Sequence, residues 1–146
     1  MNNNISQVLD DTGIIYTTLN LEQEEKNEDR QINTYFIKLL IQNNVISGGI
    51  KEDDKMVTVL FFDNIAEYEE KIGCLQVLEI INELNQTCKF GNFTYEDKDI
   101  TYSLFIPKVE TNEISKAVFK YYFEYCLSTV KDSFEEVFCE LRKNDK

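Results

Sequence analysis

The amino-acid sequence predicts an α+β fold, in which a mainly antiparallel sheet packs with a middle helix and a long C-terminal helix. Two strand-like segments, residues 45–50 and 56–62, are separated by five polar residues, which suits a hairpin and not a crossover. A second pair of strand-like segments surrounds an acidic tip. Apolar residues recur every three or four positions before and after this second pair, as in helices. Hairpins join antiparallel strands, so we expect helices and sheet to form separate layers.

The first part of the chain is predicted to hold one short helix. Residues 5–11 place their apolar side chains on one face of such a helix, and Gly13 follows as a C-cap. The apolar face consists of Ile5, Val8 and Leu9. Residues 14–16 continue as a short extended piece. Residues 22–30, EQEEKNEDR, are interpreted as a solvated acidic loop, with an acidic recognition loop as the alternative.

Strands are predicted next, because residues 32–41 and 45–50 are rich in β-branched and aromatic residues. Gly48 and Gly49 are adjacent in the second segment and predict a bulge or a bend. A polar turn is expected at residues 51–55.

The segment 56–62, MVTVLFF, is the strongest strand candidate and is apolar on both faces. Val57, Val59 and Phe61 point one way, and Met56, Thr58, Leu60 and Phe62 point the other. A strand of this kind is central and covered on both sides, or it lies at an interface.

A helix is predicted after this strand, capped by Asp63 or Asn64 and ending before Phe90. Its apolar stripe is Ile65, Tyr68, Ile72, Leu75, Leu78, Ile81 and Leu84. Near its end lie Asn82 and Asn85, whose amides are expected to bond to the backbone where the chain leaves the helix. Contact with a ligand is the alternative role for these two side chains.

A hairpin is predicted from residues 90–95 and 100–106, with its tip at residues 96–99. Apolar residues alternate along its second strand, which indicates burial on one face, and Pro107 ends that strand. The alternating residues are Ile100, Tyr102, Leu104 and Ile106.

The last predicted element is helical and covers residues 112–143. Its apolar positions are Ile114, Val118, Tyr121, Tyr125, Val130, Phe134, Val137, Phe138 and Leu141. Their phase slips near Ser128, and Ser133 and Glu136 have the spacing of a capping box. One long helix and two consecutive helices both fit; one helix is preferred.

Aromatic residues cover more than one face of this last helix, so some of them are expected to meet a partner. The aromatic set is Phe119, Tyr121, Tyr122, Phe123 and Tyr125. Together with the second face of the 56–62 strand, it supplies the candidate partner-binding residues. These are Tyr122, Phe123, Phe119, Phe62 and Leu60. They predict a homodimer or a complex with another protein.

Composition excludes several functions. The chain of 146 residues fits a single domain, residues 1–146, and carries 27 acidic against 15 basic residues, for a net charge of −12. This balance argues against direct binding to nucleic acid or to an anionic membrane. The sequence shows no secretory signal and no apolar run of membrane-spanning length, so a cytoplasmic location is expected.

Catalysis and cofactors are also not expected. The chain has no histidine, which removes the usual general base, and no glycine-rich phosphate loop. The four cysteines are unclustered, so no zinc site is expected, and we interpret them as free, mostly buried thiols in a reducing compartment. They are Cys74, Cys88, Cys126 and Cys139. No catalytic, metal or cofactor-binding residue is therefore predicted.

Residues 56–106 resemble the YbjN-like bacterial proteins. The resemblance rests on the strand MVTVLFF, the helix end INELNQ and the hairpin KFGNFTYEDKDITYSLFIP, followed by a final helix. The opening ISQVLDDTGI also resembles the short first helix of that family. Residues 22–30 and 32–50 match less well and indicate an enlarged first hairpin.

This resemblance implies the fold of type III secretion chaperones and a homodimer that holds a peptide or protein on an apolar surface. Members of the family are described as sensory-transduction regulators, and the resemblance implies no catalytic residue. We therefore expect a non-catalytic protein-binding regulator or chaperone-like adaptor. The alternative is an acidic inhibitor or immunity-type protein that mimics nucleic acid or blocks a basic site. A carboxylate-dependent enzyme is the third hypothesis.

Overall fold

The computed structural model describes residues 4–22, 31–41, 44–64, 73–96, 99–108 and 114–143. Its helices are α1 (Asn4–Thr12), α3 (Cys74–Thr87) and α4 (Lys116–Lys143). Its strands are β1 (Tyr16–Glu22), β2 (Gln31–Ile41), β3 (Asn44–Glu52), β4 (Met56–Asn64), β5 (Asn92–Glu96) and β6 (Asp99–Pro107).

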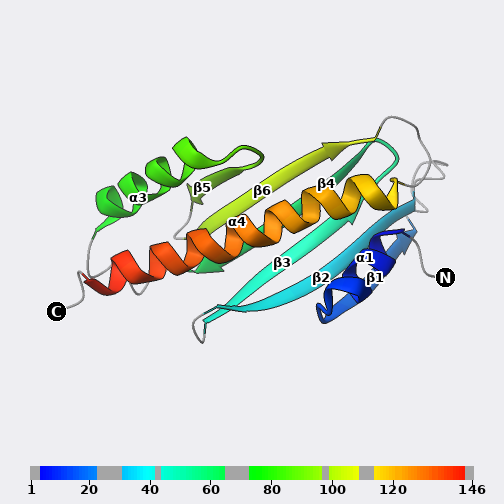
Figure 1. The fold of residues 1–146 in the computed structure, drawn as a ribbon, viewed down its shortest axis with the longest axis horizontal. Helices are drawn as coiled ribbons and strands as arrows, with labels where there is room; N and C mark the ends of the chain where they lie inside the picture. The colour runs from blue at the N-terminus through cyan, green and yellow to red at the C-terminus, as the bar shows by residue number, and fades with distance from the viewer. Residues whose placement is uncertain are drawn as a thin grey trace.

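The strands form one six-stranded sheet in the order β1-β2-β3-β4-β6-β5, and every neighbouring pair is antiparallel. The long helix α4 runs across one face of the sheet, with α1 beside it over β1 and β2 (Figure 1). The helix α3 lies next to the edge strand β5, and β1 forms the opposite edge. The predicted α+β fold with an antiparallel sheet, a middle helix and a long C-terminal helix is confirmed.

Alternation of side chains along the strands explains where the core lies. In β6 the predicted residues point toward α4 and are almost completely buried, whereas Thr101, Ser103 and Phe105 point away. In β4 the three side chains of one face, Val57, Val59 and Phe61, are fully buried. The predicted short helix is present as α1, with its three apolar residues buried and Gly13 at its C-terminus with φ 73°.

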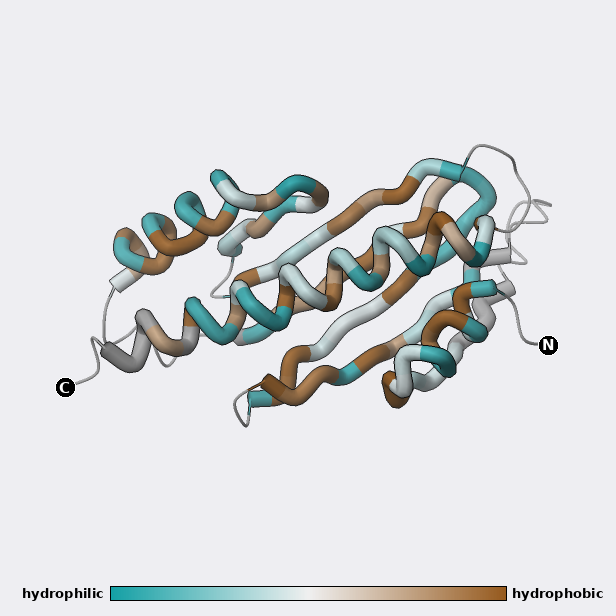
Figure 2. Tube along the Cα trace, in the orientation of Figure 1, coloured by the Kyte–Doolittle hydropathy of each residue, from teal (hydrophilic) through white to brown (hydrophobic). Residues whose placement is uncertain are grey.

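The helix α4 is continuous, and its buried residues follow a single stripe without a phase slip. The stripe is Phe119, Phe123, Cys126, Val130, Phe134 and Val137. Figure 2 shows hydrophobic and hydrophilic residues alternating turn by turn along α4. The preferred single helix is confirmed, but the stripe predicted for its first half is wrong. Val118 and Tyr121 are exposed, because the helix turns Phe119 and Phe123 toward the sheet.

The middle helix differs from its prediction. Asp63 and Asn64 are the last residues of β4, and α3 begins at Cys74. Gly73, immediately before it, has φ 86°, which an uninterrupted α-helix does not allow. Residues 65–72 lie outside the described residues. The buried face of α3 is Val77, Ile81 and Leu84, whereas the predicted stripe residues Leu75 and Leu78 are exposed.

Three further details of the strands depart from expectation. The strand β1 is longer than the predicted extended piece and was not foreseen, whereas residues 23–30 of the acidic loop lie outside the described residues. The register of β3 with β2 and β4 is regular through Gly48 and Gly49, so the predicted bulge is absent there. The turn between β3 and β4 is tighter than predicted and is held by Asp53, which accepts hydrogen bonds from the amides of Lys55 and Met56, both at 2.8 Å.

A buried ion pair joins the end of β3 to the residue that follows β6. Lys108 Nζ lies 3.3 Å from Glu52 Oε2, and both side chains are almost inaccessible to solvent. Lys108 Nζ also donates to the carbonyl of Asp53 at 3.0 Å, and Glu52 Oε2 accepts from the amide of Ile114 at 3.4 Å. The pair therefore ties the end of β3 and the segment after β6 to the residues just before α4.

Candidate functional site

The face of the sheet opposite α1 and α4, here called the open face, carries most of the exposed large hydrophobic side chains of the strands. Residues directly opposite each other in an antiparallel pair share a face, so the register assigns them. The exposed hydrophobic residues of the open face are Phe36, Leu40, Val45, Leu60, Phe62 and Phe105. They are 37–71% exposed, so a broad apolar surface faces solvent in the described part of the chain.

Leu60 and Phe62 lie on this open face, as the two apolar sides of β4 predicted, and are 37% and 44% exposed. Sequence analysis missed the other four residues. Side chains of alternating type in β2 and β6 hinted at these residues. The alternation identifies an open-face residue only once the register places those strands in the same sheet as β4.

The aromatic residues of α4 require a correction. Phe119 and Phe123 are fully buried and stack on each other, with ring centroids 5.2 Å apart and an interplanar angle of 16°. They belong to the core and are not available to a partner. Tyr122 is half-buried and packs edge-on against Phe90 at 5.2 Å, on the helix side of the sheet. The five predicted residues therefore do not form one site.

Tyr125 shows why aromatic residues gather at this part of α4. Its hydroxyl accepts hydrogen bonds from the amides of Lys89 at 2.7 Å and Phe90 at 3.3 Å. The hydroxyl of Tyr102 donates to the carbonyl of Phe90 at 2.7 Å. These tyrosines fasten the loop between α3 and β5, so their role is structural.

Two adjacent glycines of β3 face opposite sides of the sheet. On the buried side, a Cβ on Gly48 would lie 2.6 Å from the ring of Phe61, so only glycine fits there. On the open face, a Cβ on Gly49 would meet no atom of the described residues closer than the carbonyl oxygen of Tyr35 at 3.7 Å. Phe36 and Leu60 are the cross-strand neighbours of Gly49 on either side. Gly49 thus leaves a gap between two exposed apolar side chains, and we call this gap the notch.

The open face also carries two exposed lysines, Lys38 on β2 and Lys51 on β3. The other described open-face side chains of β2, β3 and β4 are uncharged. They are Thr34, Phe36, Leu40, Val45, Ser47, Met56, Thr58, Leu60 and Phe62. The centre of this face is therefore apolar and locally basic, in a chain with a net charge of −12.

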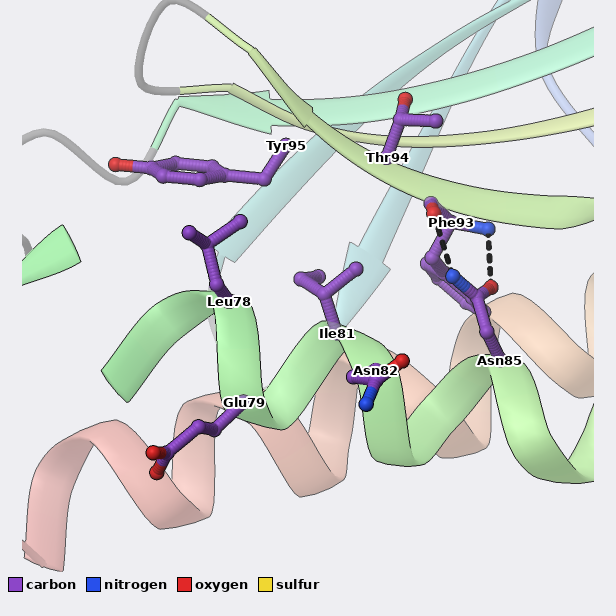
Figure 3. A pocket seen from close by; sticks show the side chains of 8 residues that line it. All are labelled: Leu78, Glu79, Ile81, Asn82, Asn85, Phe93, Thr94 and Tyr95. Carbon is purple, nitrogen blue, oxygen red and sulfur yellow. Dashed lines mark hydrogen bonds between the residues drawn. The ribbon is translucent and has the colours of Figure 1, made fainter. Parts of the chain in front are cut away.

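A second candidate region is an open hollow of about 550 Å³ between α3 and β5 (Figure 3). Asn85 closes one end of it: its Nδ2 donates to the carbonyl of Phe93 at 2.8 Å, and its Oδ1 accepts from the amide of Phe93 at 2.6 Å. The predicted backbone role is confirmed for Asn85. Asn82 is exposed and lines the hollow, and Leu78 and Ile81 point toward Tyr95.

The hydroxyl of Tyr95 is buried and has no hydrogen-bond partner among the described residues. It is the only buried side-chain polar atom of the hollow's lining with this property. Glu79, Asn82 and Thr94 are exposed, and the half-buried amide of Asn85 is bonded to the backbone of Phe93. The hollow therefore lacks the convergent polar groups that fix a small ligand.

The cysteines are free, as expected, but the prediction that they are mostly buried is wrong. Only Cys126 is buried; Cys88 is half-buried, and Cys74 and Cys139 are exposed. Burial raises the pKa of Cys126 well above the ordinary range of a thiol, and burial raises the pKa of Cys88 as well. Both thiols are thereby held protonated, and a protonated thiol is a poor nucleophile.

Within the described residues, no three cysteine, aspartate or glutamate side chains gather as a metal site would require. None of the helices in this part of the chain has both the length and the apolar character to cross a membrane. Comparison of the chain with family models, with curated proteins and with solved structures found no match. The open face is thus the candidate functional site, on the strength of its own geometry.

Proposed function

We propose that this chain is a non-catalytic protein-binding regulator or chaperone-like adaptor, and that the open face is its binding surface. The observation that carries the proposal is the set of six exposed large hydrophobic side chains on one side of the sheet. Monomeric proteins rarely leave so many large apolar side chains in water on one face, because burying them against a partner is favourable.

The order of elements supports the same proposal. A short first helix, a run of strands, a middle helix, a hairpin and a long final helix follow each other as the resemblance to YbjN-like proteins implies. That resemblance implies a protein that holds a polypeptide on an apolar surface, either as a homodimer or with a second protein. The cell compartment consistent with this role is the cytoplasm.

The chemistry of the described residues gives little support to an enzyme. The sequence has no histidine, and the buried thiols of Cys126 and Cys88 have raised pKa values. A binding function needs none of these groups, whereas it needs exposed apolar area on a rigid element. The central strands of a six-stranded sheet are such an element.

The test compares two double variants. Phe36→Ser with Phe62→Ser removes two aromatic side chains from the open face, and Val118→Ser with Tyr121→Ser removes two similarly exposed side chains from α4. Binding of a fluorescent apolar dye should fall in the first variant and persist in the second. Any self-association that light scattering detects across a wide concentration range should follow the same pattern.

A wild-type protein that stays strictly monomeric and binds no apolar dye would contradict the proposal. Salt provides a further control, since an apolar surface keeps its affinity as ionic strength rises. The alternative, an acidic mimic of nucleic acid, would lose affinity steeply under the same conditions.

A further inference from the structure

We propose that the partner of the open face is an acidic amphipathic segment of another polypeptide. One of its apolar side chains fills the notch at Gly49, and its carboxylates lie near Lys38 and Lys51. This inference rests on the proposed function and narrows it to one class of partner. Three observations carry it: the unfilled notch, the positions of the two lysines and the lack of an acidic side chain beside them on the open face of β2, β3 and β4.

The notch is not required by the fold. Glycine in a strand weakens it, because glycine loses more backbone freedom on folding and packs no side chain. Gly48 is explained by the ring of Phe61, but no steric reason explains Gly49, whose missing Cβ would be in ordinary contact. A regular register also excludes a bulge. With a steric clash and a bulge both excluded, one reason for a glycine within a strand remains, which is the close approach of a ligand or another chain.

The dimensions of the notch suit one side chain. Phe36 and Leu60 flank Gly49 on the neighbouring strands, so their Cα atoms lie about 10 Å apart, two strand spacings. Both side chains project from the sheet and are exposed. A leucine, methionine or phenylalanine of a partner can enter between them and contact the backbone of β3 directly.

The lysines lie on either side of the notch. Lys51 follows Gly49 by two residues on the same face of β3, about 7 Å away. Lys38 pairs with Ser47, two residues before Gly49 on that same strand. A segment that runs along β3 over Gly49 therefore meets the ammonium group of one lysine before the notch and that of the other lysine after it.

An acid already lies near one of these lysines, but it is engaged elsewhere. Burial acts to raise the pKa of Asp53, but hydrogen bonds from the amides of Lys55 and Met56 outweigh it, and the charge of Lys51 adds to them, so that the pKa is lowered. The carboxylate of Asp53 thus serves the turn. Lys38 and Lys51 remain exposed to solvent and to a partner.

Charge selects a different chain over a second copy of this one. Two open faces placed together would bring the lysines of both copies into an apolar interface, where the described open-face residues of β2, β3 and β4 supply no acid to pair with them. The acids that the register places on this face, Asp99 and Glu96, lie at one end of β6 and β5, beside the edge of the sheet. Like charges across an interface cost affinity and act against the wrong partner. An acidic amphipathic segment satisfies both the notch and the lysines.

The experiment uses three synthetic, fluorescein-labelled amphipathic peptides of about 18 residues with the same leucine and phenylalanine positions. Their polar positions are glutamate, glutamine or lysine. Fluorescence anisotropy with the full chain should give the tightest binding for the glutamate peptide and the weakest for the lysine peptide, roughly tenfold apart for two exposed ion pairs. The net charge of −12 alone would favour the opposite order.

Two sets of variants locate the effect. Gly49→Val should keep or raise the midpoint of thermal unfolding and weaken the glutamate peptide at least tenfold, because it fills the notch. Gly49→Ala is the milder version, and Thr58→Val, which places a β-branched apolar residue on the same face without filling the notch, should bind like the wild type. Lys38→Gln with Lys51→Gln should abolish the preference for glutamate over lysine and leave the glutamine peptide unchanged.

Unchanged binding by a folded Gly49→Val, or an equal or stronger affinity for the lysine peptide, would overturn the inference. If peptides bind without charge preference and Phe36→Ser with Phe62→Ser abolishes that binding, the proposed function stands and this inference fails. If binding does not depend on Phe36 and Phe62, both fail. The inference would also be overturned if a second copy of the chain occupied the open face and the glutamate peptide did not displace it.

Discussion

The two faces of β4 carry similar apolar residues but differ in how far those residues are buried. Val57, Val59 and Phe61 on one face are completely buried, whereas Leu60 and Phe62 on the other are 37% and 44% exposed. Both faces would be assigned to a core from hydrophobicity alone. The difference arises because α1 and α4 lie on the same side of the sheet, so a single layer of helices covers a single face (Figure 1).

This comparison separates residues that fold the protein from residues that folding does not require. Burying a large apolar side chain stabilises a protein by about 1.5–3 kcal/mol. Residues of the open face gain only part of that stabilisation, so their hydrophobic character has to be explained by something other than the stability of the monomer. The following predictions test this division.

The largest effect is expected from Phe123→Ala, on the covered side. Removing this fully buried ring should lower the free energy of unfolding by about 3–5 kcal/mol, because a cavity is left in the core. Phe62→Ala, on the open face, should cost less than about 1.5 kcal/mol, since its ring is already partly hydrated. Chemical denaturation of both variants measures the difference, and equal losses would erase the distinction between the faces.

A comparable effect is expected at the buried ion pair. Lys108→Ala leaves the carboxylate of Glu52 buried without its cation and should cost about 3–5 kcal/mol. Lys116, whose ammonium lies 3.2 Å from Asp11 in an exposed pair, is the matched control, and Lys116→Ala should cost at most about 1 kcal/mol. Similar unfolding midpoints for the two variants would show that the Glu52 pair contributes little.

An intermediate effect should distinguish the two glycines. Gly48→Ala places a methyl group against the ring of Phe61 and should cost about 1–3 kcal/mol, the usual range for overpacking. Gly49→Ala should be neutral or stabilising by up to about 1 kcal/mol, because the space is free and alanine loses less backbone entropy than glycine. Thermal melts of the two variants measure the difference in stability. A destabilised Gly49→Ala variant would mean that the fold requires glycine at the notch.

The smallest effect is expected at the β5 edge, which belongs to neither face. Asn85→Ala removes two hydrogen bonds to the backbone of Phe93 and should cost about 0.5–2 kcal/mol. Asn82→Ala, one helical turn earlier and exposed, should leave stability unchanged. If Asn85→Ala were fully stable and instead impaired binding of the partner, the structural role of its amide would be wrong.

The sequence predicted those parts of the fold that local periodicity determines. Alternation in β6 gave the correct buried residues, and both apolar faces of β4 pointed to Leu60 and Phe62. The strand β1 was missed because Thr17 and Thr18 give it little alternation; it forms by pairing with β2. The start of α3 was misplaced because the apolar spacing continues across Gly73 and gives no sign of its positive φ, which lies directly before the first residue of the helix.

The candidate site was harder to predict because it depends on which of two helical stripes faces the sheet. Phe119 and Tyr121 are both aromatic, and only the stripe that begins at Phe119 continues without a break to Val137. Choosing the other stripe created an apparent phase slip at Ser128 and made Phe119 and Phe123 seem available to a partner. Gly49 gave no signal of its own, because its meaning depends on neighbours from β2 and β4.

The helix α4 also has a consequence for how the protein is made. At 28 residues it is about 42 Å long, and it packs against α1 near one end and brings Phe134 to Phe93 of β5 toward the other. It follows all six described strands, so most of the covered side of the sheet stays exposed until α4 leaves the ribosome. During synthesis the nascent sheet therefore presents apolar side chains on both sides, and this interval is when it is most prone to aggregate.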